Sequence, residues 1–383
     1  MTKEVIQALA FSAPALCALA CMAVMFMDVF LPGKNRQERQ LRLFLMLTYL
    51  VAALCWIGLI LQVIAHRTYV HYHPIFFFTL MMDQVLIFRF VHIITSVRQH
   101  DRFNILHFAA PVMLTALITV SMLVIPFEKR LSILYETGDS MENRWYGFLN
   151  HLSGIVFICY NILYPVLSLR RIRNYRREIV NYSADTRRTS LDWLFILQLL
   201  ALITIPVPLA GMLLNIEIFN NFWTSMQGVL PTFFVYPILC YNLLSDNYEI
   251  MTTDDDSLPD KLTGETYDES LSGKSSVIDP KRFDKYMKDE QPYMNPKIHV
   301  TDFATALHTN IKYVSVYIKN SYGINFSCFI NRCRLDELMR LRKSPQMQNR
   351  DNMELILMAG FSSYRSYLRA KEAQDREEVL TIP

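Results

Sequence analysis

The chain has 383 residues, of which 52% are hydrophobic and 19% are charged, and its formal net charge is +3 at pH 7. This composition excludes an ordinary soluble globular protein, because it is too rich in apolar residues for that class. The net charge indicates no particular partner, since it averages over regions of opposite charge.

Seven apolar runs occupy most of the first 244 residues, and each is long enough to cross a hydrocarbon core of roughly 30 Å as a helix. They cover residues 5–31, 41–65, 74–97, 105–127, 146–167, 191–214 and 222–244. The first run is too long for a removable signal peptide and lacks a small-residue cleavage site, so we expect it to span the membrane. The sequence therefore predicts an all-α fold, in which a seven-helix transmembrane bundle over residues 1–245 precedes a small soluble helical domain.

Basic residues are distributed unevenly among the loops between these runs. Thirteen of them lie between runs one and two, three and four, and five and six, whereas the N-terminus and the remaining loops hold five. Short cytoplasmic loops carry an excess of Lys and Arg. We therefore predict a multi-pass protein of the bacterial inner (cytoplasmic) membrane, with its N-terminus outside and its C-terminal domain in the cytoplasm.

Residues 246–278 form an acidic segment after the last run, with nine acidic residues and two lysines. Such a segment has too little apolar surface to fold alone. We predict a flexible tether that is repelled by the anionic inner leaflet. An ordinary solvated linker without a tuning role is the alternative.

Capping signals from residue 279 onward predict a soluble helical domain that extends to residue 383. Asp279-Pro280 would open its first helix, and Gly323 and Ser344-Pro345 would end two later ones. The other predicted helix starts are the caps Thr301, Asn310, Asn352 and Ser362 and, for a long helix to residue 342, Phe326.

Two helix-turn-helix units joined by this long helix are expected in the C-terminal domain. Gly323 and Gly360 lie where the chain must reverse between helices, and positive φ costs little only for glycine. The residues expected to form the turns and cores of the two units are Phe303, Ala304, Gly323, Phe326, Arg334, Leu335, Gly360 and Phe361.

Several short motifs within residues 299–371 carry a family resemblance. They are DFA at 302–304, YVS at 313–315, GINF at 323–326, RL at 334–335 and GFSS at 360–363. With these motifs the segment resembles the DNA-binding domain of the AraC/XylS family of transcriptional regulators. The resemblance implies that the second helix of each unit enters a major groove of double-stranded DNA.

Polar side chains at helical spacing are the candidates for DNA contacts. Arg365 and Arg369 lie on one helix face, four residues apart. Arginine suits bidentate reading of guanine, and lysine suits contacts to phosphate. The predicted DNA-binding residues are Lys312, Ser315 and Lys319 in the first unit, and Tyr364, Arg365 and Arg369 in the second.

Asp83 is the candidate sensing residue of the membrane domain. An ionised side chain near the bilayer centre costs at least about 2.5–3.5 kcal/mol, so we expect Asp83 to face the bundle interior with a partner. We predict no catalytic residues, no metal ligands and no cofactor, because the sequence shows no paired catalytic constellation, Gly-rich phosphate loop or metal-ligand spacing.

These observations together predict a membrane-tethered, sequence-specific DNA-binding transcription regulator, and not an enzyme. Its partners would be double-stranded DNA, the lipid bilayer and an unknown signal ligand or membrane partner, and a homodimer is one route for signalling. One alternative is a seven-span receptor or transporter whose degenerate helix-turn-helix tail binds a protein. Another is an intramembrane enzyme that uses Asp83, His92 or His151.

Overall fold

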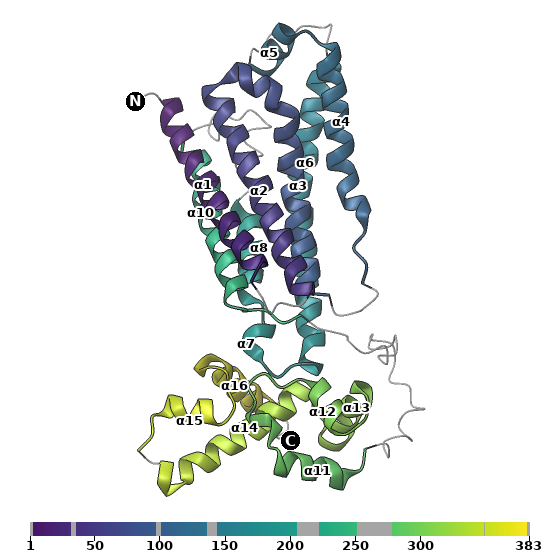
Figure 1. Ribbon diagram of the computed structural model, residues 1–383, viewed down its shortest axis with the longest axis vertical. Coiled ribbons are helices and arrows are strands. Elements are labelled where there is room, and N and C mark those ends of the chain that lie inside the picture. Colours follow the sequence, from purple (N-terminus) through teal and green to yellow (C-terminus); the bar gives the residue numbers. More distant parts are fainter. Residues whose placement is uncertain are drawn as a thin grey trace. The chain divides into compact units, whose positions relative to one another are not determined.

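The computed structural model describes residues 3–31, 36–96, 101–135, 144–204, 222–250, 278–347 and 349–380. Every regular element within these ranges is a helix, as the sequence predicts (Figure 1). Internal contacts divide the chain into two compact units. The first comprises Met1–Thr95, Asp101–Ile172 and Asp192–Asp246, and the second comprises Ser96–His100, Arg173–Leu191 and Asn247–Pro383. Most of the predicted acidic tether, residues 251–277, lies outside the described residues.

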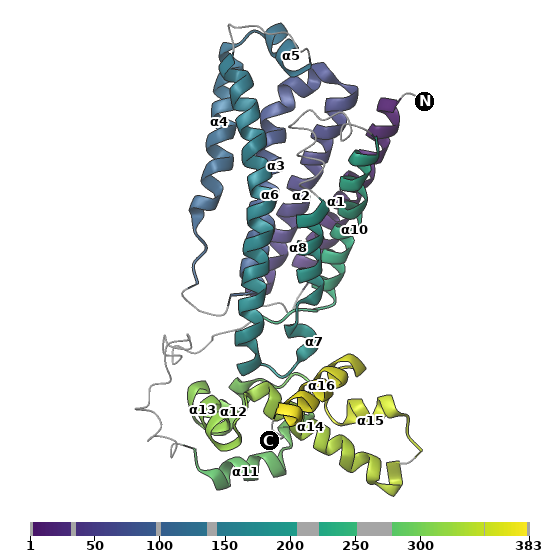
Figure 2. The ribbon, with the colours of Figure 1, turned by 180° about the vertical axis from the view of Figure 1, so that it is seen from behind.

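The first unit is a bundle of long helices. Its elements are α1 (Lys3–Val29), α2 (Arg36–Ile64), α3 (His66–Ile94), η1 (Ile105–Phe108), α4 (Ala109–Val124), α5 (Phe127–Tyr135), α6 (Arg144–Glu178), α8 (Asp192–Thr204) and α10 (Phe222–Leu244). Helices α1, α2, α3 and α6 lie side by side in both views (Figure 1, Figure 2). The last residues of α6, from Arg173 onward, belong to the second unit.

Five helical stretches among the described residues are long and apolar enough to cross a membrane. They are Glu4–Val29, Gln37–Ile64, His66–Ile94, Ile105–Val124 and Trp145–Asn181, which coincide with the first five predicted spans. The sixth and seventh predicted spans coincide with shorter described apolar stretches, Asp192–Thr204 and Gly228–Leu244. Residues 205–214 of the sixth predicted span lie outside the described residues. These lengths are compatible with a multi-pass membrane protein.

Buried polar contacts join the helices of the bundle. Arg42 of α2 is 2% exposed and forms an ion pair with Asp28 of α1. The hydroxyl of Tyr49 on α2 donates a hydrogen bond of 2.9 Å to the main-chain oxygen of Tyr236 on α10. A buried charge or hydroxyl is costly unless it is paired, so these contacts fix how α1, α2 and α10 pack.

The second unit consists of shorter elements. Besides the end of α6 they are η3 (Ile179–Asn181), α7 (Thr186–Thr189), α11 (Pro280–Asp289), η6 (Pro292–Met294), α12 (Val300–Ala306), α13 (Ile311–Tyr322), α14 (Phe326–Lys343), η7 (Pro345–Met347), α15 (Asn352–Met358) and α16 (Tyr364–Leu380). We call α12 with α13 the first helix pair and α15 with α16 the second helix pair. The long helix α14 joins the two pairs (Figure 1).

Helix α14 contributes to two apolar cores. The first includes Phe283, Phe303, Val314, Ile318 and Phe326, and the second includes Leu335, Leu338, Ile356, Phe361 and Tyr367. Each fully buried side chain of this kind contributes about 1.5–3 kcal/mol. The two helix pairs therefore each have a core, and one continuous helix holds both.

Two predicted helix starts and two predicted helix ends of the second unit agree with the structure. The side chains of Asp279 and Asn310 accept hydrogen bonds from the backbone amides of Lys281 and Tyr313, each at 3.0 Å. Gly323 ends α13 at φ +75°, and Ser344 ends α14. Side-chain oxygens at the two helix starts satisfy amides that the first helical turn leaves without partners.

Three predicted caps are wrong by one or two residues. Helix α12 begins at Val300 after His299, not after Thr301. Helix α15 is capped by Asp351, whose side chain accepts from the amide of Met353 at 3.1 Å, and not by Asn352. The cap of α16 is Ser363 instead of Ser362. Asp351 and Asn352, like Ser362 and Ser363, both carry cap-forming side chains, so the local signal does not distinguish the two neighbours.

Candidate functional site

The first helix pair has a tightly defined start. The carboxylate of Asp302, in the first turn of α12, accepts a hydrogen bond of 2.8 Å from the backbone amide of His299. Helix α13 then begins at its cap Asn310 and runs for 12 residues. Its N-terminal end is the part that a helix-turn-helix protein would direct at base edges.

The predicted DNA-binding residues of α13 differ in their exposure. Lys319 is exposed, and its Nζ donates a hydrogen bond of 3.0 Å to the main-chain oxygen of Gly323. Lys312 is half-buried. The hydroxyl oxygen of Ser315 is buried and has no hydrogen-bond partner in the described structure. The basic side chains of the first pair are therefore more accessible than its hydroxyl.

The turn of the second helix pair depends on Gly360. This residue has φ +93°, and a Cβ there would lie 2.4 Å from the main-chain oxygen of Tyr293. Directly after it, Ser363 and Ser366 exchange hydrogen bonds. The hydroxyl of Ser363 accepts from the amide of Ser366 at 3.2 Å, and the hydroxyl of Ser366 accepts from the amide of Ser363 at 3.1 Å. This reciprocal cap sets the start of α16.

The predicted DNA-binding residues of the second pair lie in the first two turns of α16. Tyr364 is 48% exposed, Arg365 is exposed and Arg369 is half-buried. Both arginines take part in interactions within the chain. The structure brings the three side chains together at the N-terminal end of one helix, where the sequence places them.

Replacing Ser363 by alanine is expected to loosen the start of α16, because the amide of Ser366 loses its acceptor. Loss of a serine cap typically costs about 1 kcal/mol. Amide hydrogen exchange of the full-length protein should therefore be faster at Ser366. Ser363→Thr keeps a hydroxyl acceptor at the cap and should leave that amide unchanged, whereas equal acceleration in both variants would contradict the assignment of Ser363.

Arg334 is a buried guanidinium at the centre of the second unit, with 2% of its surface exposed. Its Nε donates to the main-chain oxygen of Tyr293 and its Nη2 to that of Asn295, both at 2.8 Å. The guanidinium also lies over the ring of Phe361, 5.9 Å from the ring centre. Arg334 therefore ties the η6 turn and the turn of the second helix pair to α14.

The negatively charged group near Arg334 lies outside the C-terminal residues 278–383. Burial lowers the pKa of Arg334 to about 10, and the nearby carboxylate of Asp185 opposes this shift. The side chain is thus protonated near neutral pH. Its Nη1 also donates to the main-chain oxygen of Ala184, at 3.4 Å. Both Asp185 and Ala184 precede α8, far from the C-terminal domain in sequence.

Residues 179–191, which we call the docking segment, belong to the core of the second unit. The amide of Val300 donates to the main-chain oxygen of Tyr182 at 2.9 Å, and the amide of Ala184 donates to that of Ile298 at 3.5 Å. These bonds form an antiparallel bridge before α12. Ala184 is 1% exposed and packs in the first apolar core. The sequence suggested only a basic cytoplasmic loop here.

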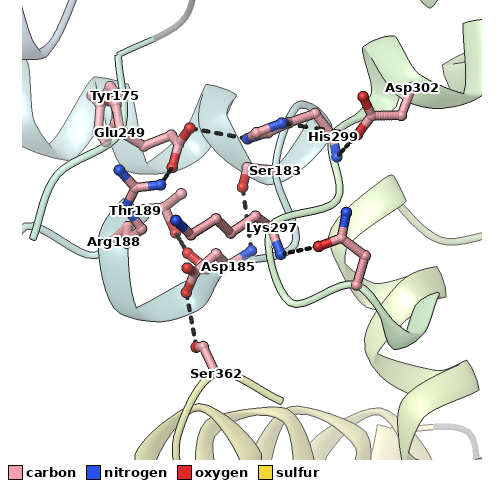
Figure 3. Close-up of polar contacts among 11 residues, drawn as sticks. Tyr175, Ser183, Asp185, Arg188, Thr189, Glu249, Lys297, His299, Asp302 and Ser362 are labelled. Carbon is pink, nitrogen blue, oxygen red and sulfur yellow. Dashed lines mark hydrogen bonds and ion pairs between the residues drawn. The ribbon is translucent and has the colours of Figure 1, made fainter. Parts of the chain in front are cut away.

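Asp185 connects the docking segment to the second helix pair. It is 3% exposed, and its carboxylate accepts a hydrogen bond of 3.0 Å from the hydroxyl of Ser362, just before α16 (Figure 3). Its own main-chain oxygen accepts from the hydroxyl of Thr189 at 2.8 Å, which closes helix α7. One carboxylate therefore lies close to both the buried Arg334 and the start of α16.

Glu249 joins three further parts of the second unit. It is 8% exposed, and its carboxylate lies 2.9 Å from Nε2 of His299 and 3.1 Å from Nη1 of Arg188 (Figure 3). Its main-chain oxygen accepts a hydrogen bond of 2.7 Å from the hydroxyl of Tyr175 on α6. The residues that follow α10, the end of α6, the docking segment and the start of the first helix pair thus meet at one carboxylate.

The candidate sensing residue Asp83 lies on α3 in the bundle. One of its carboxylate oxygens is buried and has no hydrogen-bond partner in the described part of the chain. The expected partner is therefore not found there. No group of three His, Cys, Asp or Glu side chains that could hold a metal ion occurs among the described residues.

The docking segment and Glu249 are the residues that sequence reasoning missed. Their contacts join residues that are distant in sequence, and Asp185 is 177 residues from Ser362. A backbone bridge leaves no side-chain pattern to detect. Comparisons of the chain with protein-family models, with curated proteins and with solved structures find no match.

Proposed function

We propose that the protein is a membrane-anchored, sequence-specific DNA-binding transcription regulator. The observation that carries this proposal is the arrangement of two short helix pairs on one long helix, each with a capped second helix. Such an arrangement suits two helix-turn-helix units that read successive major grooves. The buried positions of Phe303, Phe326, Arg334 and Phe361 support it, because these residues also carry the family resemblance.

The proposed orientation places the helix pairs in the cytoplasm. It rests on the excess of basic residues in alternate loops and on a bundle of seven spans, in which α8 and α10 are parts of the last two. An odd number of spans with the N-terminus outside brings the C-terminal unit to the side where DNA is found. The membrane bundle would then act as the sensing domain.

A signal would act by binding one state of the bundle more tightly than another, since a ligand shifts an equilibrium only by its differential affinity. Asp83 supports a sensing role, because its buried carboxylate oxygen has no partner among the described residues and would gain one from a ligand or a proton. Dimerisation in the membrane would let two tails bind tandem sites with raised effective concentration.

Exchanging Arg365 and Arg369 for alanine should strongly weaken the binding of discrete DNA sites. A bidentate contact between arginine and a base contributes about 1–3 kcal/mol, so the double variant should lose at least about tenfold in affinity. Genome-wide crosslinking and recovery of DNA with the full-length tagged protein would measure site occupancy for the wild type and the variant side by side.

The matched control removes two positive charges elsewhere in the same unit. Arg282 and Lys285 lie on α11, outside both helix pairs, and their alanine variant should keep the occupied sites. If no sites are enriched for the wild-type protein under several growth conditions, the DNA-binding proposal fails. The alternative would then be a membrane receptor or transporter whose tail binds a protein partner.

A further inference from the structure

The docking segment contacts the residues that lead into each helix pair and the helix that joins the pairs. Its backbone is bridged to residues 298–300, which lead into the first helix pair. Its Ala184 oxygen accepts from Arg334 of α14, and its Asp185 carboxylate accepts from Ser362 before the second helix pair. A surface loop that merely rested on this unit would not bury Ala184 and Asp185 to 1% and 3% exposure.

We infer that residues 179–191 are an integral part of the unit that carries the helix pairs, and that Asp185 is the residue that positions the start of α16. In addition, we infer that a chain cut within residues 251–277 keeps its C-terminal fragment on the membrane. The role in DNA reading rests on the proposed function, whereas the docking itself does not.

Asp185 is the residue of the docking segment that lies close to two different parts of the C-terminal residues. Two hydrogen-bonding groups of the C-terminal part, the guanidinium of Arg334 and the hydroxyl of Ser362, have this carboxylate as a neighbour. The hydrogen bonds that Arg334 donates to Tyr293, Asn295 and Asn331 all go to neutral oxygen atoms, so they do not balance its charge. Burying a cation is less unfavourable when an opposite charge lies nearby, and the Asp185 carboxylate favours the protonated form of Arg334.

The docking segment is also linked covalently to helices of the bundle. The segment follows α6 directly and leads into α8, while Glu249 follows α10. A change in these helices would therefore be passed to the segment and to Glu249 through the covalent chain. From there it reaches His299, Arg334 and Ser362 by direct contacts, without passing through residues 251–277. The covalent link across 251–277 is thus dispensable for attachment.

The inference is tested on the full-length protein in membranes, with a site for a specific protease inserted within residues 251–277. After cleavage the membranes are sedimented, and the C-terminal fragment is quantified in the pellet and in the supernatant. We expect the wild-type fragment to sediment with the membranes. Asp185→Ala should raise the ratio of released to retained fragment by about tenfold to a hundredfold, because a charge-assisted hydrogen bond is lost.

Matched variants separate the contribution of the Asp185 charge from that of its hydrogen bond to Ser362. Asn181 is an exposed residue of the same segment, and Asn181→Ala should retain the fragment as the wild type does. Asp185→Asn keeps an acceptor for Ser362 but removes the charge near Arg334, so its release should be intermediate. The double variant of Asp185→Ala and Ser362→Ala should release less than the two single effects predict, because partners in direct contact are not additive.

Two results would overturn the inference. If the wild-type fragment appears in the supernatant directly after cleavage and still resists further proteolysis, the segment does not hold it. If Asp185→Ala retains the fragment like the wild type, Asp185 does not hold the start of α16 on the docking segment. Neither measurement involves DNA, so a failure of the proposed transcriptional role would leave the docking result standing.

Discussion

Arg334→Ala is expected to destabilise the C-terminal unit by about 3–6 kcal/mol, because each of the two hydrogen bonds that its buried guanidinium donates at 2.8 Å contributes about 1.5–3 kcal/mol. The substitution removes the Arg334 donor from the main-chain oxygens of Tyr293 and Asn295, of which Asn295 keeps the amide of Ile298, and it leaves Asp185 without its nearby cation. Since domains are stable by only about 5–15 kcal/mol, a large part of the total would be lost. Pulse proteolysis of the full-length protein in urea would measure it.

Two further variants test this reasoning about Arg334. Arg334→Lys keeps the charge but lacks the planar fork that reaches two carbonyl oxygens, so we expect an intermediate loss. Arg332 is an exposed residue on the same helix, and Arg332→Ala should leave the urea midpoint unchanged. An unaltered midpoint for Arg334→Ala would mean that its hydrogen bonds contribute nothing net to stability.

Local signals account for what the sequence predicts correctly. Asp279, Asn310 and Gly323 act on backbone groups within four residues of themselves, so their roles can be predicted from the residue type and its spacing. The apolar runs behave in the same way, because the first five coincide with helices long enough to cross a membrane. Helical periodicity likewise identifies the buried residues of the helix pairs.

Contacts between distant residues account for what could not be predicted. The choice of Ser363 over Ser362 as the cap of α16 follows from Asp185, which engages the hydroxyl of Ser362 from a distant part of the chain. Helix α6 continues to Glu178, beyond the predicted span, and its last residues take part in the second unit. Nothing in the basic sequence of this region distinguishes a docked segment from a solvated loop.

Gly360→Ala is the second substitution that we expect to destabilise the C-terminal unit strongly. Gly360→Ala should cost about 1–2 kcal/mol for a side chain at positive φ. The added Cβ would also lie 2.4 Å from the main-chain oxygen of Tyr293, and relieving such overpacking costs a further 1–3 kcal/mol or so. The urea midpoint of the second unit should fall accordingly in pulse proteolysis of the full-length protein.

Gly323 provides the matched comparison, because it has φ +75° but a Cβ added there would meet no described atom within 4 Å. Gly323→Ala should therefore show the conformational cost alone and be the milder of the two substitutions. The oxygen that Gly360→Ala would displace is also the acceptor of the Nε of Arg334. Combining Gly360→Ala with Arg334→Ala should thus destabilise less than the two separate losses predict, since both act on Tyr293. Equal effects of the two glycine substitutions would show that the close approach to Tyr293 is not what requires glycine at 360.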